Sequence, residues 1–310
     1  MSADLDALDR ALAVLRAGGL VAFPTETVYG LGADARNEIA VRRIFRVKGR
    51  PADHPVIVHI GHAAEIDEWA SDVPDAARVL AAAFWPGPLT IVVNKAVHVL
   101  DAVTGGRPSV GLRVPAHPLT LDLLNRFGRG VAAPSANRFG RVSPTTAAHV
   151  IADLDGDVDV VLDGGPCAIG VESTIVDLTA EPVVLRAGGV PLERLSSVLG
   201  VSLKLDDRGP SRAPGMLASH YAPTCRVEIG ASHEARERLE ALAGPGITAR
   251  LIDASDADRL APNLYAELRA ADADGVDVLL AVLPDERGLG SAVADRLRKA
   301  AAPREQDDRP

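Results

Sequence analysis

The 310-residue sequence has only two cysteines, Cys167 and Cys225, and neither belongs to a Cys-x-x-Cys or Cys/His pattern. Such widely separated cysteines disfavour both a disulfide scaffold and a zinc site. The sequence also lacks an apolar run near the roughly 18 residues that a membrane span requires, and its N-terminus is acidic where a secretory signal would be basic. These absences predict a cytoplasmic protein in a reducing compartment, with no membrane partner.

Acidic residues outnumber basic ones, with 42 Asp and Glu against 33 Lys and Arg. Aromatic residues make up only 3% of the chain. Because nucleic-acid binders usually need basic surfaces or stacking platforms, any contact with nucleic acid should be local or indirect. Lysine itself is scarce, with four in the whole chain. One of these lysines, Lys48, directly precedes Gly49-Arg50-Pro51. In a chain that otherwise uses arginine, a lysine at this place indicates a compact ammonium with a specific role, such as facing a polyphosphate.

Several common catalytic motifs are missing. The sequence has no Gly-x-x-x-x-Gly-Lys-Ser/Thr loop, no Gly-x-Ser-x-Gly elbow, no His-Glu-x-x-His and no Gly-x-Gly-x-x-Gly after its first strand. This disfavours ordinary P-loop, hydrolase, zincin and dinucleotide-binding functions. What remains is a cleft rich in Lys, Arg, Ser and Thr without a covalent nucleophile, which suits a nucleoside triphosphate bound beside a small zwitterion.

The order of the apolar patterns predicts an α/β fold in residues 1–200. Short apolar runs typical of strands alternate with amphipathic patterns typical of helices. The expected strands are 20–23, 56–60, 89–93 and 109–114, and the expected helices are 5–15, 38–46, 75–84 and 119–127. Runs at 174–178 and 183–185 are close enough to pair as antiparallel strands, so we expect a mixed sheet.

The rest of the chain divides into three further parts. Residues 201–224 are rich in proline and glycine and are expected to form a linker. Residues 225–302 show a β-α-β-α-β-α pattern, typical of a small Rossmann-like unit. The charged tail, 303–310, is expected to be disordered.

Individual polar segments allow both a structural and a functional interpretation. The segment from Phe23 to Gly32 is either a polar turn or a binding loop at the end of a strand. Arg113 lies on a predicted strand, where it either forms an internal ion pair or holds a carboxylate or phosphate. Ser143 is either a helix cap or a phosphate contact, and His59 by itself would be a structural histidine.

Six segments taken together carry a resemblance. They are Pro-Thr-Glu-Thr-Val-Tyr-Gly-Leu-Gly (24–32), Lys-Gly-Arg-Pro (48–51), Phe-Trp-Pro-Gly-Pro-Leu-Thr (84–90), Gly-Leu-Arg-Val-Pro (111–115), Pro-Ser-Ala-Asn (134–137) and Glu-Ser-Thr-Ile-Val-Asp (172–177). In this order they resemble the YrdC-like family, the L-threonylcarbamoyladenylate synthases. Ser-His-Tyr-Ala-Pro (219–223) and Gly-Leu-Gly-Ser-Ala-Val-Ala-Asp-Arg-Leu (288–297) resemble its two-domain branch. The resemblance implies a YrdC-like twisted mixed sheet with flanking helices and a smaller Rossmann-like C-terminal domain.

The resemblance also implies an activity. Members of that family are nucleotidyltransferases that condense L-threonine, bicarbonate and ATP into threonylcarbamoyl-AMP and pyrophosphate, for the threonylcarbamoyladenosine modification of tRNA. A separate transferase complex then uses the product, and direct contact of this chain with tRNA stays open. Magnesium is expected to accompany ATP, with no protein ligand and no organic cofactor.

The implied site residues fall into two groups. By resemblance, L-threonine would be held by Thr27, His59, Arg113, Ala133 and Ser173. ATP would face Lys48, Arg50, His54, Ser109, Ser135, Asn137, Ser143, Arg186 and the linker's Tyr221, which would act as a lid. Lys48, Arg50 and Arg113 are the expected catalytic residues. Two residues depart from the pattern that the resemblance implies. His54 stands where asparagine is usual before the proline, and Pro134 stands where the single-domain branch often has threonine.

Two other functions stay open. One is a carbamoyl-adenylate former that uses carbamoyl phosphate, although the chain lacks the zinc-finger cysteines that accompany such enzymes. The other is an RNA-binding module without chemistry, suggested by the basic residues between Arg42 and Arg50.

Overall fold

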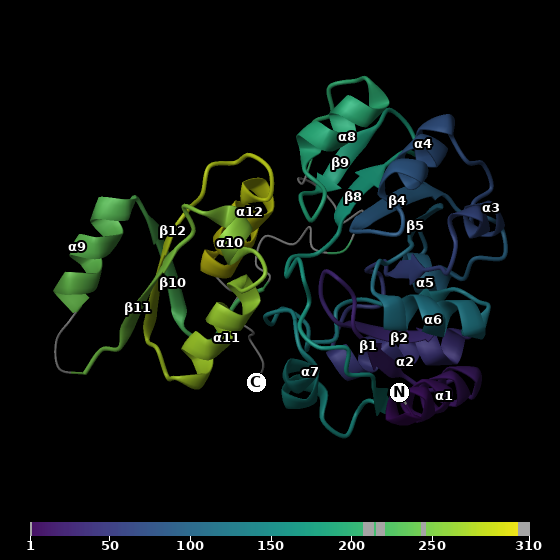
Figure 1. The fold of residues 1–310 in the computed structure, drawn as a ribbon, viewed down its shortest axis with the longest axis horizontal. Helices are drawn as coiled ribbons and strands as arrows, with labels where there is room; N and C mark the ends of the chain where they lie inside the picture. Colours follow the sequence, from purple (N-terminus) through teal and green to yellow (C-terminus); the bar gives the residue numbers. More distant parts are fainter. Residues whose placement is uncertain (1, 207–213, 215–220, 243–245, 303–310) are drawn as a thin grey trace.

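The computed structural model describes residues 2–206, 214, 221–242 and 246–302. The chain forms a large and a small α/β domain that lie side by side (Figure 1). Parts of the predicted linker and the whole predicted tail lie outside the described residues. In the described part of the chain, no helix is long and apolar enough to cross a membrane.

The large domain is built on a mixed nine-stranded sheet in the order β7-β1-β2-β6-β3-β5-β4-β8-β9. The strands are β1 (Val21–Phe23), β2 (Gly30–Asp34), β3 (Ile57–His59), β4 (Leu89–Asn94), β5 (Ser109–Arg113), β6 (Val131–Ala132), β7 (Val160–Val161), β8 (Thr174–Asp177) and β9 (Val183–Arg186). Strands β8 and β9 pair antiparallel, whereas β3 and β5 pair in parallel. The prediction of a mixed sheet is therefore confirmed.

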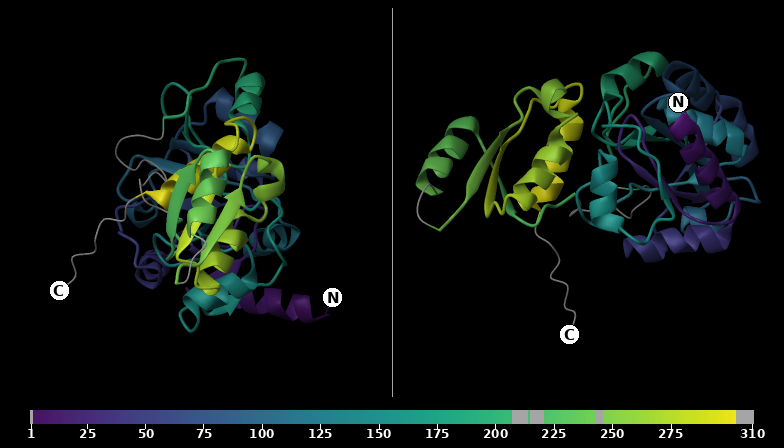
Figure 2. Two further views of the ribbon diagram at one scale, coloured as in Figure 1. Left: turned by 90° about the vertical axis from the view of Figure 1, so that its left-hand side faces the viewer. Right: turned by 60° about the horizontal axis from the view of Figure 1, so that its bottom comes forward.

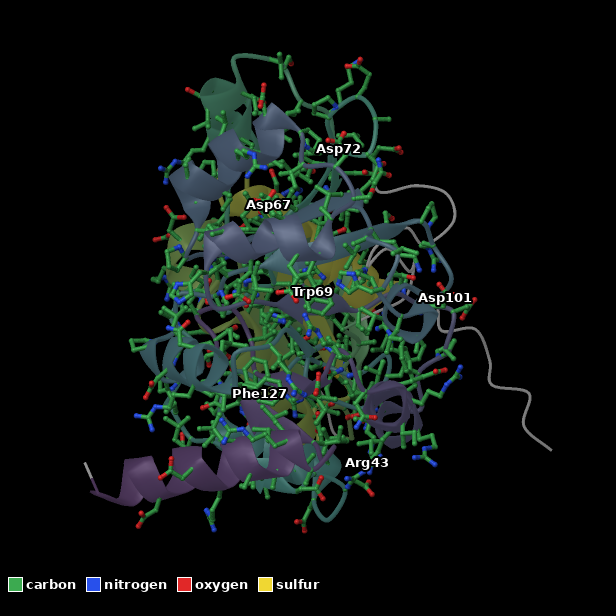
Figure 3. All side chains as sticks on the ribbon, turned by 90° about the vertical axis from the view of Figure 1, so that its right-hand side faces the viewer. Arg43, Asp67, Trp69, Asp72, Asp101 and Phe127 are labelled. Atoms are coloured by element: carbon green, nitrogen blue, oxygen red, sulfur yellow. The ribbon has the colours of Figure 1, made fainter. Side chains whose placement is uncertain are left out.

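Helices cover the sheet of the large domain. They are α1 (Ser2–Arg16), α2 (Glu38–Lys48), the 3-10 turn η1 (Ala63–Glu65), α3 (Ile66–Trp69), α4 (Asp75–Phe84), α5 (Asp101–Thr104), α6 (Pro118–Phe127), α7 (Ala147–Leu154) and α8 (Leu192–Leu199). The Trp69 side chain is 1% exposed and belongs to the main apolar core, while Arg43 and Asp101 lie toward the edges of the domain (Figure 3).

Capping residues set the two ends of helix α2, which carries Lys48. Asn37 caps the start of α2, with its side-chain oxygen accepting from the Ala40 N–H, and Gly49 ends the helix at a φ of 65°. Lys48 is therefore the last residue of α2, so the expectation that it lies beyond the helix end was wrong. Since the helix ends here, the ammonium and Arg50 turn inward, and both are buried.

Two other expectations need correction. Residues 30–32 were expected to belong to a polar turn or loop, but they begin strand β2. A Cβ at Gly32 would lie 2.5 Å from the Phe23 ring, so only glycine fits there. Ser143 does not cap a helix. Thr146 caps α7 by accepting from the His149 N–H, and the Ser143 hydroxyl is directed elsewhere.

The small domain has a parallel three-stranded sheet in the order β10-β12-β11. Its elements are β10 (Arg226–Gly230), α9 (Ser232–Leu242), β11 (Ala249–Asp253), α10 (Ala257–Leu260), α11 (Leu264–Ala273), β12 (Val278–Val282) and α12 (Gly290–Ala301). The last strand is thus the central one. Helix α9 covers the outer face of this sheet, whereas α10, α11 and α12 lie on the side of the large domain (Figures 1 and 2).

Candidate active site

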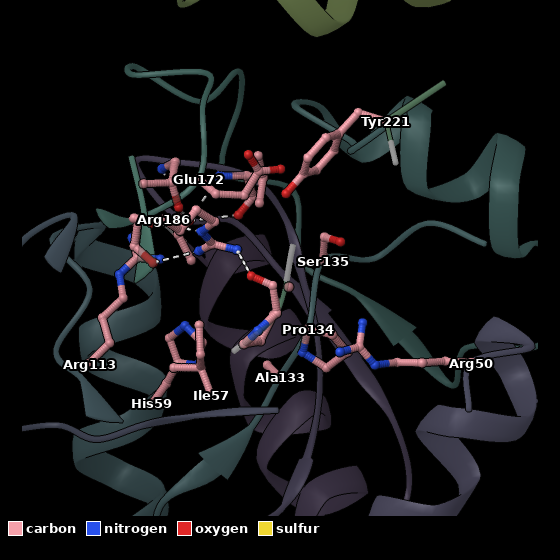
Figure 4. Close-up of a pocket in the computed structure, with 16 residues that line it drawn as sticks. Arg50, Ile57, His59, Arg113, Ala133, Pro134, Ser135, Glu172, Arg186 and Tyr221 are labelled. Carbon is pink, nitrogen blue, oxygen red and sulfur yellow. Dashed lines mark hydrogen bonds between the residues drawn. The ribbon is translucent and has the colours of Figure 1, made fainter. Parts of the chain in front are cut away.

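A cleft opens in the large domain, beneath the small one (Figure 4). Concave sites of this kind, with a few convergent polar groups, are where small molecules usually bind. The predicted site residues that line it are Thr27, Arg50, His59, Arg113, Ala133, Ser135, Ser173, Arg186 and Tyr221. The structure therefore brings together side chains that lie far apart in the sequence and that were assigned to both substrates.

The turn between β1 and β2 places Thr27 in the wall of the cleft. The Thr25 hydroxyl donates to the Val28 carbonyl at 2.6 Å and accepts from the N–H groups of Thr27 and Val28. Its oxygen also lies 2.8 Å from the Thr27 hydroxyl oxygen. The interpretation as a polar turn is confirmed, since the Thr25 hydroxyl builds it. The turn presents Thr27 to the cleft, and the role of the segment in binding stays a prediction.

His59 and Arg113 stand next to each other at the ends of β3 and β5, where the strand register pairs them. The Arg113 Nε donates to the Gly87 carbonyl at 3.2 Å. Its Nη2 lies 2.8 Å from Glu26 Oε1 but is too poorly aligned for a hydrogen bond, so both atoms keep bonding capacity. Burial and the neighbouring Arg113 lower the pKa of His59 to about 3, so its imidazole is neutral at physiological pH.

Arg50 lines the other side of the cleft, and Lys48 holds the loop that brings Ser135 to it. The Lys48 ammonium donates to the backbone carbonyls of Ser135, at 2.6 Å, and Asn137, and so holds the 135–137 loop. Arg50 donates to the Pro55 carbonyl at 3.0 Å and lines the cleft opposite Arg113 (Figure 4). Burial, together with Arg50, lowers the pKa of Lys48 well below its usual value.

Arg186, at the end of β9, organises the third wall. Its Nε and Nη2 donate to the carbonyl and hydroxyl of Ser173, each at 3.0 Å, and its Nη1 donates to the Pro214 carbonyl at 2.9 Å. The Ser173 and Thr90 hydroxyl oxygens lie 2.7 Å apart. Ser173, assigned to threonine, and Arg186, assigned to ATP, therefore form one connected unit at the boundary of the two subsites.

Unpartnered polar atoms concentrate at this site. In the described residues, eight buried side-chain atoms lack a hydrogen-bond partner, and they include Arg50 Nε, His59 Nδ1 and Arg113 Nη2 in the wall of the cleft. Glu26 Oε1 and Asn137 Oδ1 belong to the same set beside it. Because native proteins leave few buried polar groups unpaired, this concentration indicates a polar ligand.

The buried basic residues of the site are also only partly neutralised. Arg113 faces Glu26, but within the described residues no carboxylate forms an ion pair with Lys48, Arg50 or Arg186, all of which are buried. Burial lowers the pKa of Arg50 to about 10, and Arg186 adds to that effect. A ligand with several negative charges would relieve this excess of buried positive charge.

Five predicted residues do not line the cleft: Lys48, whose contacts are given above, and the four described next. Ser109 borders a smaller neighbouring cavity with Pro214, and the half-buried His54 packs edge-on against the Phe139 ring. Asn137 donates to the carbonyls of Arg138 and Arg141, both at 2.8 Å. Ser143 donates to Glu172 at 2.7 Å. The roles of these residues toward ATP stay predictions.

Sequence reasoning missed the two buried acids, Glu26 and Glu172, as parts of the site. Both lie inside segments quoted for the resemblance, next to threonine and serine residues that were assigned roles, so their position was the available signal. Each carboxylate is engaged by an arginine, Glu26 by Arg113 and Glu172 by Arg296. The described residues contain no group of three His, Cys, Asp or Glu that could hold a metal ion.

Known proteins resemble this chain over almost its whole length. The Sua5/YciO/YrdC family, described as "Telomere recombination", matches residues 13–188, and the family "Threonylcarbamoyl-AMP synthase, C-terminal domain" matches residues 190–302. The threonylcarbamoyl-AMP synthase of Pyrococcus abyssi is 45% identical over 93% of this chain and 92% of its own. The chain belongs to the threonylcarbamoyl-AMP synthase family.

Two more similarities support this membership. The Bacillus subtilis threonylcarbamoyl-AMP synthase is 38% identical over 95% of this chain and 93% of its own. The crystal structure of P. abyssi Sua5 complexed with L-threonine superposes with a TM-score of 0.89, at 43% identity, and covers 95% of this chain and 94% of that one. The predicted family and two-domain fold are thus confirmed, and the chain is an enzyme of the nucleotidyltransferase type.

Proposed function

We propose that this cleft condenses L-threonine, bicarbonate and ATP into threonylcarbamoyl-AMP and pyrophosphate. The observation that supports this most directly is the division of the cleft: Arg113 and His59 stand on one side, and Arg50 stands on the other (Figure 4). The first side suits the carboxylate and amine of an amino acid, and the second suits a polyphosphate. Membership of the family supports the same assignment.

On the threonine side, Arg113 would hold the carboxylate through its unpartnered Nη2. The low pKa keeps His59 neutral, so one ring nitrogen carries no proton. In the tautomer protonated on Nε2, the unpartnered Nδ1 would accept a hydrogen bond from the threonine nitrogen. Thr27 would contact the other end of the amino acid, from the turn that Thr25 fixes. Together these contacts would orient the amine toward bicarbonate.

The chemistry then needs no enzyme nucleophile. The threonine nitrogen forms a bond to the carbon of bicarbonate, and water leaves, which gives a carbamate. A carbamate oxygen forms a bond to the α-phosphorus of ATP, the bond to the β-phosphate bridging oxygen breaks, and pyrophosphate leaves with that electron pair. Arg50 and Arg186 would stabilise the charge on the phosphates, and Lys48 would hold the 135–137 loop against them.

Magnesium belongs to this proposal as part of the nucleotide substrate. The described residues offer it no cluster of carboxylates, and the two nearest acids are engaged by arginines. Its ligands would therefore be phosphate oxygens and water. The downstream partner would be a transferase that moves the threonylcarbamoyl group to tRNA, and the site where this chain works in the cell would be the cytoplasm.

The test is release of pyrophosphate from MgATP in the absence of tRNA. Release that requires both threonine and bicarbonate supports the proposal. Replacing threonine by serine, or bicarbonate by carbamoyl phosphate, should give much less pyrophosphate. Retention of tRNA without any threonine-dependent turnover would support an RNA-binding module and refute the synthase assignment. Turnover with carbamoyl phosphate alone would point to the other carbamoyl-adenylate chemistry.

A further inference from the structure

The Glu172 carboxylate is a junction between the two domains. It accepts a hydrogen bond from Ser143 at 2.7 Å, from the Tyr265 hydroxyl at 2.7 and 2.9 Å, and from Arg296 Nε at 2.8 Å. Tyr265 lies on α11 and Arg296 on α12, so the small domain supplies two of these three donors. All four residues are buried.

Arg296 also contacts residues other than Glu172. Its Nη2 donates to the Ala187 carbonyl at 3.0 Å, directly after Arg186, and its guanidinium lies 5.0 Å from the centre of the Tyr221 ring. Tyr221 in turn stacks on Tyr265, with ring centres 5.7 Å apart. Arg296 belongs to the segment 288–297, which was quoted for the resemblance and which no step of the proposed chemistry uses.

The charges explain why this arrangement concerns the cleft. Glu172 has two buried arginines near it, Arg186 and Arg296, and the ion pair is made with Arg296. Arg186 is thereby left to Ser173 and to the cleft. Burial alone would raise the pKa of Glu172, but Arg296 and then Arg186 outweigh it and lower that pKa to about 2, so the carboxylate stays charged.

Resting on the proposed function, we propose that Arg296 and Tyr265 of the small domain are positioning residues for the nucleotide side of the cleft, and that they act through Glu172. Arg296 serves as the counter-ion of Glu172, so that Arg186 remains available to phosphate. Without Arg296, the buried carboxylate would turn to Arg186 and draw it away from the ligand. Tyr265 holds the same carboxylate in place through its hydroxyl.

The decisive experiment measures the binding of ATP and of threonine by calorimetry, together with pyrophosphate release, for Arg296→Met, Glu172→Gln and the double variant. Arg296→Met should weaken ATP binding by about tenfold, the scale of one charged hydrogen bond, and should change threonine binding much less. The double variant should recover ATP binding to within about threefold of the parent, because the amide cannot compete for Arg186. Tyr265→Phe should show a smaller loss of ATP affinity.

A matched control is Arg298→Met, on the same helix, whose guanidinium forms an exposed ion pair with Glu286 inside the small domain. It should bind ATP like the parent. If the double variant binds ATP no better than Arg296→Met, or if Arg298→Met loses as much affinity, the counter-ion role is wrong and the cluster merely joins the domains. Melting temperatures show whether each variant is folded, and Arg296→Gln, which also removes the charge, replaces Arg296→Met should the latter not fold.

The binding series also separates the two proposals. A parent protein that binds ATP and threonine but releases no pyrophosphate would refute the synthase assignment, whereas the comparison of ATP affinities would still decide the role of Arg296. A parent that binds neither substrate would overturn both.

Discussion

The guanidinium of Arg113 lies 2.8 Å from the carboxylate of Glu26, yet the two groups do not form an aligned hydrogen bond. The acid neutralises the arginine and leaves its Nη2 able to donate to a ligand. An arginine paired in this way is held in place and still has bonding capacity directed at the cleft, which distinguishes it from a purely structural ion pair.

We therefore expect Arg113→Ala to raise the KM for threonine by about 100-fold, since a charged hydrogen bond to the carboxylate is lost. The KM for ATP should change by less than about threefold, and the experiment is threonine-dependent pyrophosphate release at saturating ATP. An equal increase in both KM values would contradict the assignment of Arg113 to the amino acid.

Lys48→Met should impair the use of the nucleotide. The buried ammonium holds the carbonyls of Ser135 and Asn137, so its loss frees the loop on the ATP side and should weaken ATP binding by about tenfold or more. Binding of threonine alone, measured by calorimetry, should stay within about twofold of the parent. As a control, Lys95→Met removes a lysine whose ammonium pairs with Asp101 away from the cleft.

Tyr221 supplies a third prediction. Its buried ring lines the cleft and lies under the Arg296 guanidinium. Tyr221→Ala should lower both ATP affinity and the yield of intact product per ATP consumed, because water then reaches the carbamate and the mixed anhydride. Tyr221→Phe keeps the ring and should retain most of the yield. An unchanged yield in the alanine variant would exclude a lid role.

The low pKa of His59 predicts that the stability of the folded protein depends on pH. Its pKa is about 3 in the folded protein and about 6.5 when unfolded, so the unfolded state binds the extra proton between these values. The free energy of unfolding should therefore be unaffected by His59 above about pH 7, and it should fall as the pH drops through 6.5. By pH 5 this one residue should cost about 2 kcal/mol of unfolding free energy.

Urea unfolding of the parent and of His59→Gln at pH 8 and pH 5 checks this expectation. The glutamine variant should lose about 2 kcal/mol less than the parent between the two pH values. Equal losses in both proteins would show that His59 takes up its proton without unfolding.

His54 stands where the family usually has asparagine, and burial, followed by the repulsion of Arg50, lowers its pKa below 6.5. If it donates to the nucleotide when protonated, the KM for ATP of the parent should improve relative to His54→Asn only below about pH 6.5. Between pH 7 and 8 the ratio of the two KM values should be constant. A ratio that does not change from pH 6 to 8 would refute any protonation-dependent contact.

Residues whose surroundings are local could be placed from the sequence. The two-residue alternation placed Arg113 on a strand, and the hydroxyls at short spacing placed Thr27 in a polar turn. Their assignment to threonine came from the family resemblance, and both residues line the cleft. Strand β2 was not predicted, because its glycines are required by the Phe23 ring on a neighbouring strand, which a local pattern does not reveal.

The contacts of Ser143 and Glu172 could not be predicted for a different reason. The hydroxyl of Ser143 suits a helix cap, and only the fold brings Glu172 within 2.7 Å of it. Arg296 reaches the same carboxylate from 124 residues further along the chain. Neither periodicity nor a motif encodes a contact over that separation, because it depends on how the two domains pack.

The unneutralised cations of the cleft bear on the end of the reaction as well as on its start. Arg50 and Arg186 would meet the departing pyrophosphate with the same attraction that drew in the triphosphate. The leaving anion would thus be retained by the residues that recruited its precursor. Continuous turnover would then require that diphosphate be cleared from the surroundings, which links this enzyme's output to the cell's capacity for hydrolysing that by-product.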